Sequence, residues 1–180
     1  MMTDTTIYEL ALDTLYGRRI GPPGRSVRTN LSGIELTQCS AEAVPIIERV
    51  IASEVLPALA NPSSQTPSTQ FASIEYGPMI GLNYVFGAYL IVSVRNNLSG
   101  MIDFLCSLPP QLLYEAVNCA STFFYKTSDG YNFGVPPNKI LTRFVQRVES
   151  SPIQVISDAA KKVRLQLDSY AVGSKNPAEG

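Results

Sequence analysis

The C-terminal third of the chain has the clearest pattern of apolar and polar positions, and this pattern predicts two amphipathic helices. Residues 139–149 repeat apolar side chains every three or four positions, which places them on one face of a helix. The members of that face are Ile140, Leu141, Phe144, Val145 and Val148. Residues 151–173 keep the same spacing, with Ser151 as the cap and Gly173 as the stop. Their apolar face comprises Ile153, Ile156, Ala160, Val163 and Leu167.

Four further helices are predicted upstream. The first is capped by Asp4 or Thr5 and ends at Gly17, and its apolar side consists of Ile7, Leu10, Ala11 and Leu15. The second begins after Ser40, and Pro57 is expected to kink or end it. Its apolar stripe consists of Val44, Ile47, Ile51 and Val55. The third covers residues 99–108, and the fourth is opened by the prolines at 109 and 110.

Residues 77–94 form an uncharged apolar run that is open to three interpretations. The run is near the lower length limit for a membrane span, but Pro78 and Asn83 interrupt it. A buried core helix is therefore preferred to a span. Its tyrosine, valine and isoleucine content also suits strands, so a small β element around residues 71–94 is an alternative.

Three segments lack periodicity and separate these elements. We expect a flexible, irregular basic loop over residues 17–38, a linker over 61–70 and a polar tail over 174–180. The predicted fold is mainly α. It is a compact bundle of about five to six helices with irregular Gly/Pro-rich loops, and residues 1–180 form a single domain.

The residue inventory argues against most catalytic chemistry. The chain has no histidine, which excludes Ser-His-Asp and Cys-His arrangements and Cys/His zinc sites. It has no GxxxxGK[ST] phosphate loop, and its three cysteines lack a metal-ligand spacing. We therefore expect a protein that is not an enzyme, with no metal, no cofactor and no small-molecule substrate. A carboxylate-based enzyme remains the last alternative.

Charge is scarce and unevenly distributed. Charged residues make up 16% of the chain, against about a quarter in a typical globular protein. Low charge is one feature of a surface that meets other subunits, but composition alone favours an ordinary compact domain rich in uncharged polar residues. Four arginines, Arg18, Arg19, Arg25 and Arg28, gather in one Gly/Pro-rich stretch. Arginine forks bind phosphates, so this stretch suits a nucleic-acid backbone or an acidic patch of a neighbouring subunit.

A second basic group is predicted to lie along one side of a helix. Lys139, Arg143 and Arg147 are spaced four residues apart, which gives one cation per helical turn beside the apolar face. These cations are candidates for contact with nucleic acid or a subunit. A solvated helix face, or pairing with the glutamates at 42, 48 and 54, is the alternative. Tyr131 and Phe133, in a Gly-flanked loop, are candidate interface aromatics.

These features favour a structural assembly subunit, most concretely a viral or phage coat or nucleocapsid-type protein. Its expected partners are copies of itself and single-stranded nucleic acid. One alternative is an adaptor that binds a single protein partner. Another is a membrane-associated protein that uses residues 77–94, although a membrane is not the expected partner. The N-terminus carries no secretory signal, so the expected location is the cytoplasm or a virion.

Overall fold

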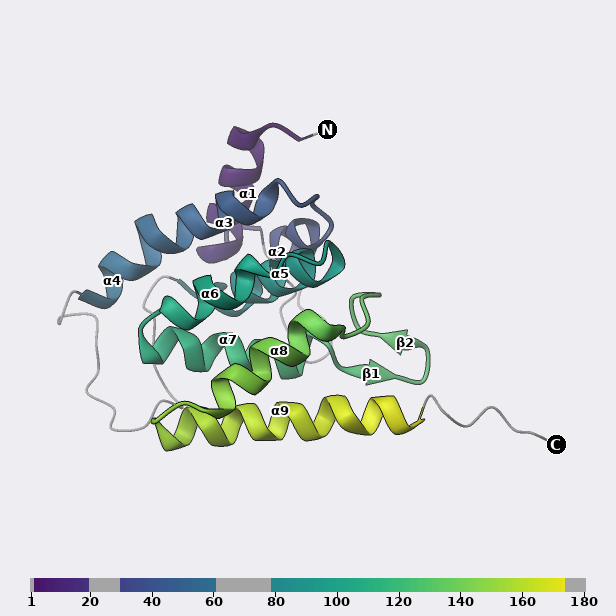
Figure 1. Cartoon of the computed structure of the whole chain (residues 1–180). Coiled ribbons are helices and arrows are strands. Elements are labelled where there is room, and N and C mark those ends of the chain that lie inside the picture. Colours follow the sequence, from purple (N-terminus) through teal and green to yellow (C-terminus); the bar gives the residue numbers. More distant parts are fainter. Residues whose placement is uncertain (1, 20–29, 61–78, 174–180) are drawn as a thin grey trace. The chain divides into compact units, whose positions relative to one another are not determined.

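The structure, a computed structural model, describes residues 2–19, 30–60 and 79–173 (Figure 1). The described residues form eight helices and one small two-stranded antiparallel sheet, which confirms the mainly α class. The number of helices exceeds the five to six expected, and one of them, over residues 31–37, lies in a segment assigned to a loop. Contacts divide the chain into two compact units, Met1–Asn96 and Asn97–Gly180, which are described separately below. The expectation of a single domain stays a prediction.

The first unit begins with α1 (Asp4–Leu15), whose predicted apolar side is buried. Thr3 caps it one residue earlier than expected, because its hydroxyl accepts a hydrogen bond from the Thr6 amide at 3.2 Å. Beyond its last turn Gly17 adopts a φ of 60°, a conformation that glycine enters without strain. The predicted stop is therefore confirmed.

Helix α2 (Leu31–Thr37) corrects the expectation of an irregular segment over residues 17–38. Asn30 explains it, because its side chain bonds in two directions. Its Oδ1 accepts from the Gly33 amide, which caps α2, and its Nδ2 donates to the Thr14 carbonyl at the end of α1. The helix is too short to show a periodic pattern, so the sequence alone did not reveal it. Residues 20–29 lie outside the described part.

Three consecutive segments make the next helix: α3 (Ala43–Val50), the π-helical turn η1 (Ile51–Val55) and α4 (Leu56–Ala60) (Figure 1). The sequence predicted that Pro57 would kink or end this helix; the helix does not end at Pro57, and a π turn precedes it. The Leu56 amide bonds to the Ile51 carbonyl, five residues back. This wider turn comes just before Pro57. Proline has no amide hydrogen to donate, and its ring crowds the carbonyl four residues back. The helix therefore continues to Ala60.

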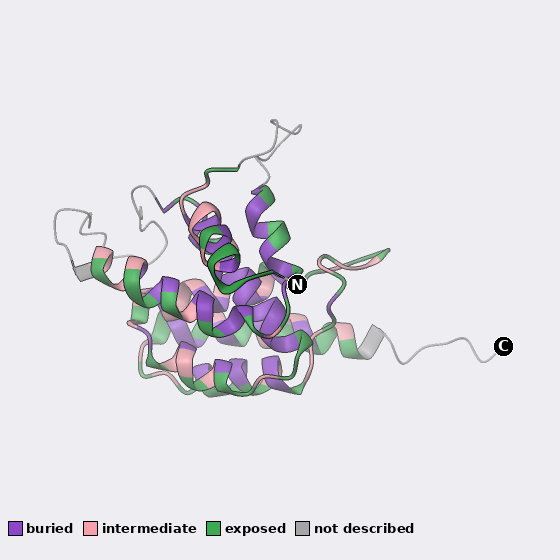
Figure 2. Ribbon diagram, turned by 90° about the horizontal axis from the view of Figure 1, so that it is seen from above, coloured by how far each residue is buried: buried purple, intermediate pink, exposed green. Residues whose placement is uncertain are grey.

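Helix α5 (Leu82–Arg95) is the buried element of the first unit. The preferred helical interpretation of the apolar run is confirmed here, and no strand forms over residues 79–94. Residues 71–78 lie outside the described part. Helices α1, α2 and α3 all pack against α5, and its residues are buried on every side from Val85 to Val94 (Figure 2). Among the described residues, no helix combines the length and apolarity needed to cross a bilayer.

The second unit contains four helices and the sheet. The helices are α6 (Gly100–Ser107), α7 (Pro110–Phe123), α8 (Lys139–Glu149) and α9 (Gln154–Gly173). Helix α9 packs against both α7 and α8, and α6 contacts α7 and α8. Asn138 caps α8 by accepting from the amides of Ile140 and Leu141. The predicted apolar face of α8 is buried, and so is that of α9 from Ile156 onward.

The sheet lies elsewhere than the sequence suggested. Strand β1 (Lys126–Thr127) pairs with β2 (Gly130–Tyr131), with Lys126 opposite Tyr131 and Thr127 opposite Gly130. Gly130 has a φ of 124°, which a side chain would strain. The β element around residues 71–94 is thus wrong where the structure describes it. A two-residue strand is too short to produce the alternation that identifies strands in a sequence.

Gly81 provides a test of how the first unit is packed. Its amide donates to the Leu15 carbonyl at 2.9 Å, and an added Cβ would stand 1.8 Å from the backbone oxygen of Thr14. Gly81→Ala is therefore expected to lower the free energy of unfolding by about 2 kcal/mol or more, measured by urea denaturation. Gly100→Ala is the control, because a Cβ there meets nothing within 4 Å. Equal stability of the two variants would contradict this packing.

Candidate functional site

The exposed side of α8 carries the predicted row of cations. Lys139, Arg143 and Arg147 are all exposed, while the opposite face of the helix is buried in the second unit. At 1.5 Å per residue the row spans about 12 Å. The helix cap at Asn138 fixes where this row begins, since it sets the first turn of α8. The spacing predicted from the sequence is therefore present as one continuous basic surface, which we call the α8 row.

The three cations of the α8 row differ in their partners. Arg147 Nη1 lies 2.6 Å from Asp103 Oδ1 of α6, and this hydrogen bond raises the pKa of Arg147. The Asp103 side chain is 79% exposed, so water can replace Arg147 at this carboxylate with little loss of free energy. Within the described residues, Lys139 and Arg143 form no ion pair or side-chain hydrogen bond. Two of the three cations are therefore free to meet an external anion.

The arginine stretch of the first unit is only partly described, because Arg25 and Arg28 lie outside the described residues. Arg19 forms a bidentate ion pair with Glu35 of α2: Nη1 donates to Oε2 at 2.8 Å and Nη2 donates to Oε1 at 2.7 Å. Arg18 lies 3.4 Å from Asp13. These two arginines thus have carboxylate partners in their own chain. From the sequence, internal pairing was an alternative for the cations of the α8 row, whereas the structure shows it for Arg18 with Asp13 and for Arg19 with Glu35.

The glutamates of the α3–α4 helix are also occupied within the first unit. Glu48 accepts a hydrogen bond of 2.7 Å from the hydroxyl of Tyr89 in α5. Glu54 accepts one of 2.6 Å from the hydroxyl of Tyr16, at the end of α1. Glu48 and Glu54 therefore join helices of the first unit, whereas Glu42 is exposed. Burial, and then the bond to Glu48, raise the pKa of Tyr89.

The candidate interface aromatics pack within the second unit. Phe133 stacks on Phe123 of α7, with ring centroids 4.8 Å apart and planes inclined by 12°. Tyr131 meets Tyr170 of α9 edge to face at 6.1 Å. Both rings are half-buried. They hold the β1–β2 hairpin onto its own helices, and a role between molecules stays a prediction.

The three cysteines are free thiols: Cys39 and Cys119 are buried and Cys106 is half-buried. Burial raises the pKa of Cys39, Cys106 and Cys119, which disfavours the reactive thiolate. Across the described ranges, no three acidic or cysteine side chains come together as a metal would require.

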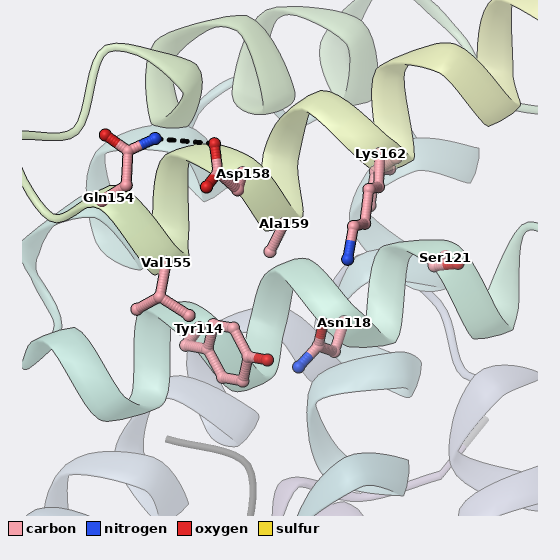
Figure 3. Close-up of a pocket in the computed structure, with 9 residues that line it drawn as sticks. Tyr114, Asn118, Ser121, Gln154, Val155, Asp158, Ala159 and Lys162 are labelled. Carbon is pink, nitrogen blue, oxygen red and sulfur yellow. Dashed lines mark hydrogen bonds between the residues drawn. The ribbon is translucent and has the colours of Figure 1, made fainter. Parts of the chain in front are cut away.

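Sequence reasoning missed a groove between α7 and α9. Helix α9 runs to Gly173, so Lys162 stands well inside it and lines the groove together with Asn118 of α7 (Figure 3). No sequence signal could have revealed this groove, since it exists only where the two helices pack side by side.

Comparisons with protein-family models, curated proteins and solved structures found no match to this chain.

The Tyr16–Glu54 bond predicts a pH dependence of stability. The bond, with some burial, raises the pKa of Tyr16 from 10.0 to about 12. A raised pKa stabilises the folded state fully below pH 10, and this contribution is lost as the pH rises toward 12. The stability difference between the wild type and Tyr16→Phe should therefore shrink over that range, as measured by urea unfolding. Tyr125→Phe, at an exposed tyrosine, is the control. A difference independent of pH would contradict the bond.

Proposed function

We propose that this chain is a non-enzymatic subunit that assembles with copies of itself, of the viral or phage coat or nucleocapsid type, and that α8 contacts single-stranded nucleic acid. The α8 row is the observation that supports this most. It offers three cations along about 12 Å, of which two are unpaired within the described residues and the third has an exposed partner.

The energetics of the row favour an external anion. Like charges four residues apart on a helix repel one another by a few tenths of a kcal/mol each. A phosphodiester backbone would remove that repulsion and release condensed counterions, which makes binding strongly dependent on salt. Arg143 supplies a planar fork for a phosphate, and Lys139 supplies a compact positive charge. Arg147 would exchange Asp103 for a phosphate, leaving a carboxylate already surrounded by water.

The proposal places nucleic-acid contact on α8 in preference to the start of the arginine stretch. Arg19 is held by two hydrogen bonds to Glu35, and binding a phosphate would leave that carboxylate without its partner. Arg18 has the looser pair, at 3.4 Å from Asp13. The α8 row therefore offers positive charge at a lower energetic cost.

A double substitution tests the nucleic-acid contact. Lys139→Gln with Arg143→Gln should weaken binding of a fluorescent oligothymidylate and reduce the slope of log K against log salt by about 1.4, because each contact contributes about 0.7 on a single strand. Fluorescence anisotropy over a salt series measures both quantities. Lys126→Gln with Lys161→Gln removes the same charge elsewhere in the second unit and should retain the slope. Equal losses in the two variants would show a general charge effect and refute the α8 site.

Assembly is tested separately on the unmodified chain. Static light scattering and negative-stain microscopy, with and without oligothymidylate, should show oligomers or polymers that grow with concentration. A monodisperse monomer across concentration and salt would reject the proposed function.

A further inference from the structure

The groove between α7 and α9 has the dimensions of a binding site. Its volume is about 500 Å³, within the range of about 300–1,000 Å³ that is usual for ligand pockets. Figure 3 shows side chains from both helices around it. The residues that matter for its chemistry are Tyr114 and Asn118 on α7, and Val155, Ala159 and Lys162 on α9.

The packing of the two helices keeps this groove open. At one end, Ser121 Oγ donates to Gln166 Oε1 at 2.6 Å, while Gln166 Nε2 donates to the Ser121 carbonyl at 2.9 Å. This reciprocal pair holds α7 and α9 together. Ala159, facing the groove, has too small a side chain to fill the space (Figure 3). The groove is therefore a feature of the folded second unit and requires no rearrangement.

The polar groups of the groove favour a carboxylate. The ammonium of Lys162 and the side-chain amide of Asn118 point into the groove from opposite helices (Figure 3). Among described residues neither side-chain group has a hydrogen-bond partner. Asp158, the acid at this site, is already engaged by Gln154 at 2.8 Å and by Lys161 at 3.3 Å. A carboxylate near Lys162 would thus meet two donors.

The remaining wall is apolar. The Val155 side chain is 38% exposed, and the ring of Tyr114 lies beside it (Figure 3). Covering such surface stabilises a complex by about 25 cal/mol per Å². The groove therefore suits a peptide in which one acidic side chain lies between apolar ones.

We infer that this groove binds residues 71–76 of a second copy, with Glu75 on Lys162. This inference rests on the proposed self-assembly. Within residues 61–78, Glu75 is the only charged side chain, and Phe71, Ile74 and Tyr76 surround it with apolar surface. The segment thus has the composition that the groove favours.

Other acids of the first unit fit this role less well. Glu35 pairs with Arg19, and Glu48 and Glu54 accept hydrogen bonds from tyrosines. Using any of them in an interface would break a bond inside the unit. Charge complementarity to Lys162, together with its apolar neighbours in the sequence, therefore favours Glu75 over these three acids.

A charge exchange between two copies tests the contact. Glu75→Lys alone and Lys162→Glu alone should each weaken self-association about tenfold, because each places like charges together in the groove. An equimolar mixture of the two variants should recover most of the wild-type association, since each copy then meets an opposite charge on its partner. Light scattering without nucleic acid measures all three samples. Lys126→Glu, in β1 and outside the groove lining, is the control for the change of charge and should retain most of the association.

The outcomes separate this inference from the proposed function. Recovery in the mixture supports the contact and also shows that both variants fold. If the wild type assembles and either variant assembles equally well, the inference is overturned while the proposed function stands. If both variants fail and the mixture does not recover, Lys162 and Glu75 do not meet between copies, and a different protein partner is then sought for the groove. A wild type that remains monomeric overturns both.

Discussion

The burial of α5 is the constraint on which the first unit depends. A helix that is apolar on every side from Val85 to Val94 must be covered, and α1, α2 and α3 supply the cover. The interior that results has to satisfy the hydroxyl of Tyr89, and Glu48 of α3 does so at 2.7 Å. At the end of α5, Arg95 donates to the Thr37 carbonyl of α2 at 2.7 Å. Packing of the apolar helix thus determines which polar residues of the surrounding helices must face inward.

This constraint changes the meaning of the charge pattern. Glu54 and Glu48 accept hydrogen bonds from Tyr16, which follows α1, and from Tyr89 of α5. Arg19 pairs with Glu35. In the described part of the first unit, these internal pairs therefore reduce the charge that is available to other molecules. The second unit leaves more charge exposed, because the apolar face of α8 is buried while its cations face the solvent. Segregated charge in a sequence indicates an interaction surface only after the internal pairs have been subtracted.

Prediction from sequence succeeded where a helix repeats its pattern over several turns. The apolar face of α8, from Ile140 to Val148, was identified residue by residue because its spacing admits no other face. It failed where structure depends on partners distant in the chain. Asn30 creates α2 by bonding to Thr14 as well as to Gly33, and the α7–α9 groove needs two helices to pack side by side. Local periodicity contains no information about such contacts. The α8 row was predictable for the same reason as the helix, whereas the role of Lys162 was not.

In the proposed function, one copy of the chain would make few contacts to nucleic acid, so strong binding would need many copies side by side. A single α8 row offers at most three phosphate contacts, which are weak at physiological salt when one copy acts alone. Copies that join through their own surfaces place many rows on one strand, so each further contact forms at a high effective concentration. Low overall charge would serve the proposed assembly, because copies with a formal net charge of -1 repel one another little. In the proposed assembly, self-association and nucleic-acid contact would therefore reinforce each other: the α8 row would gain affinity from the array, and the array would gain stability from the strand.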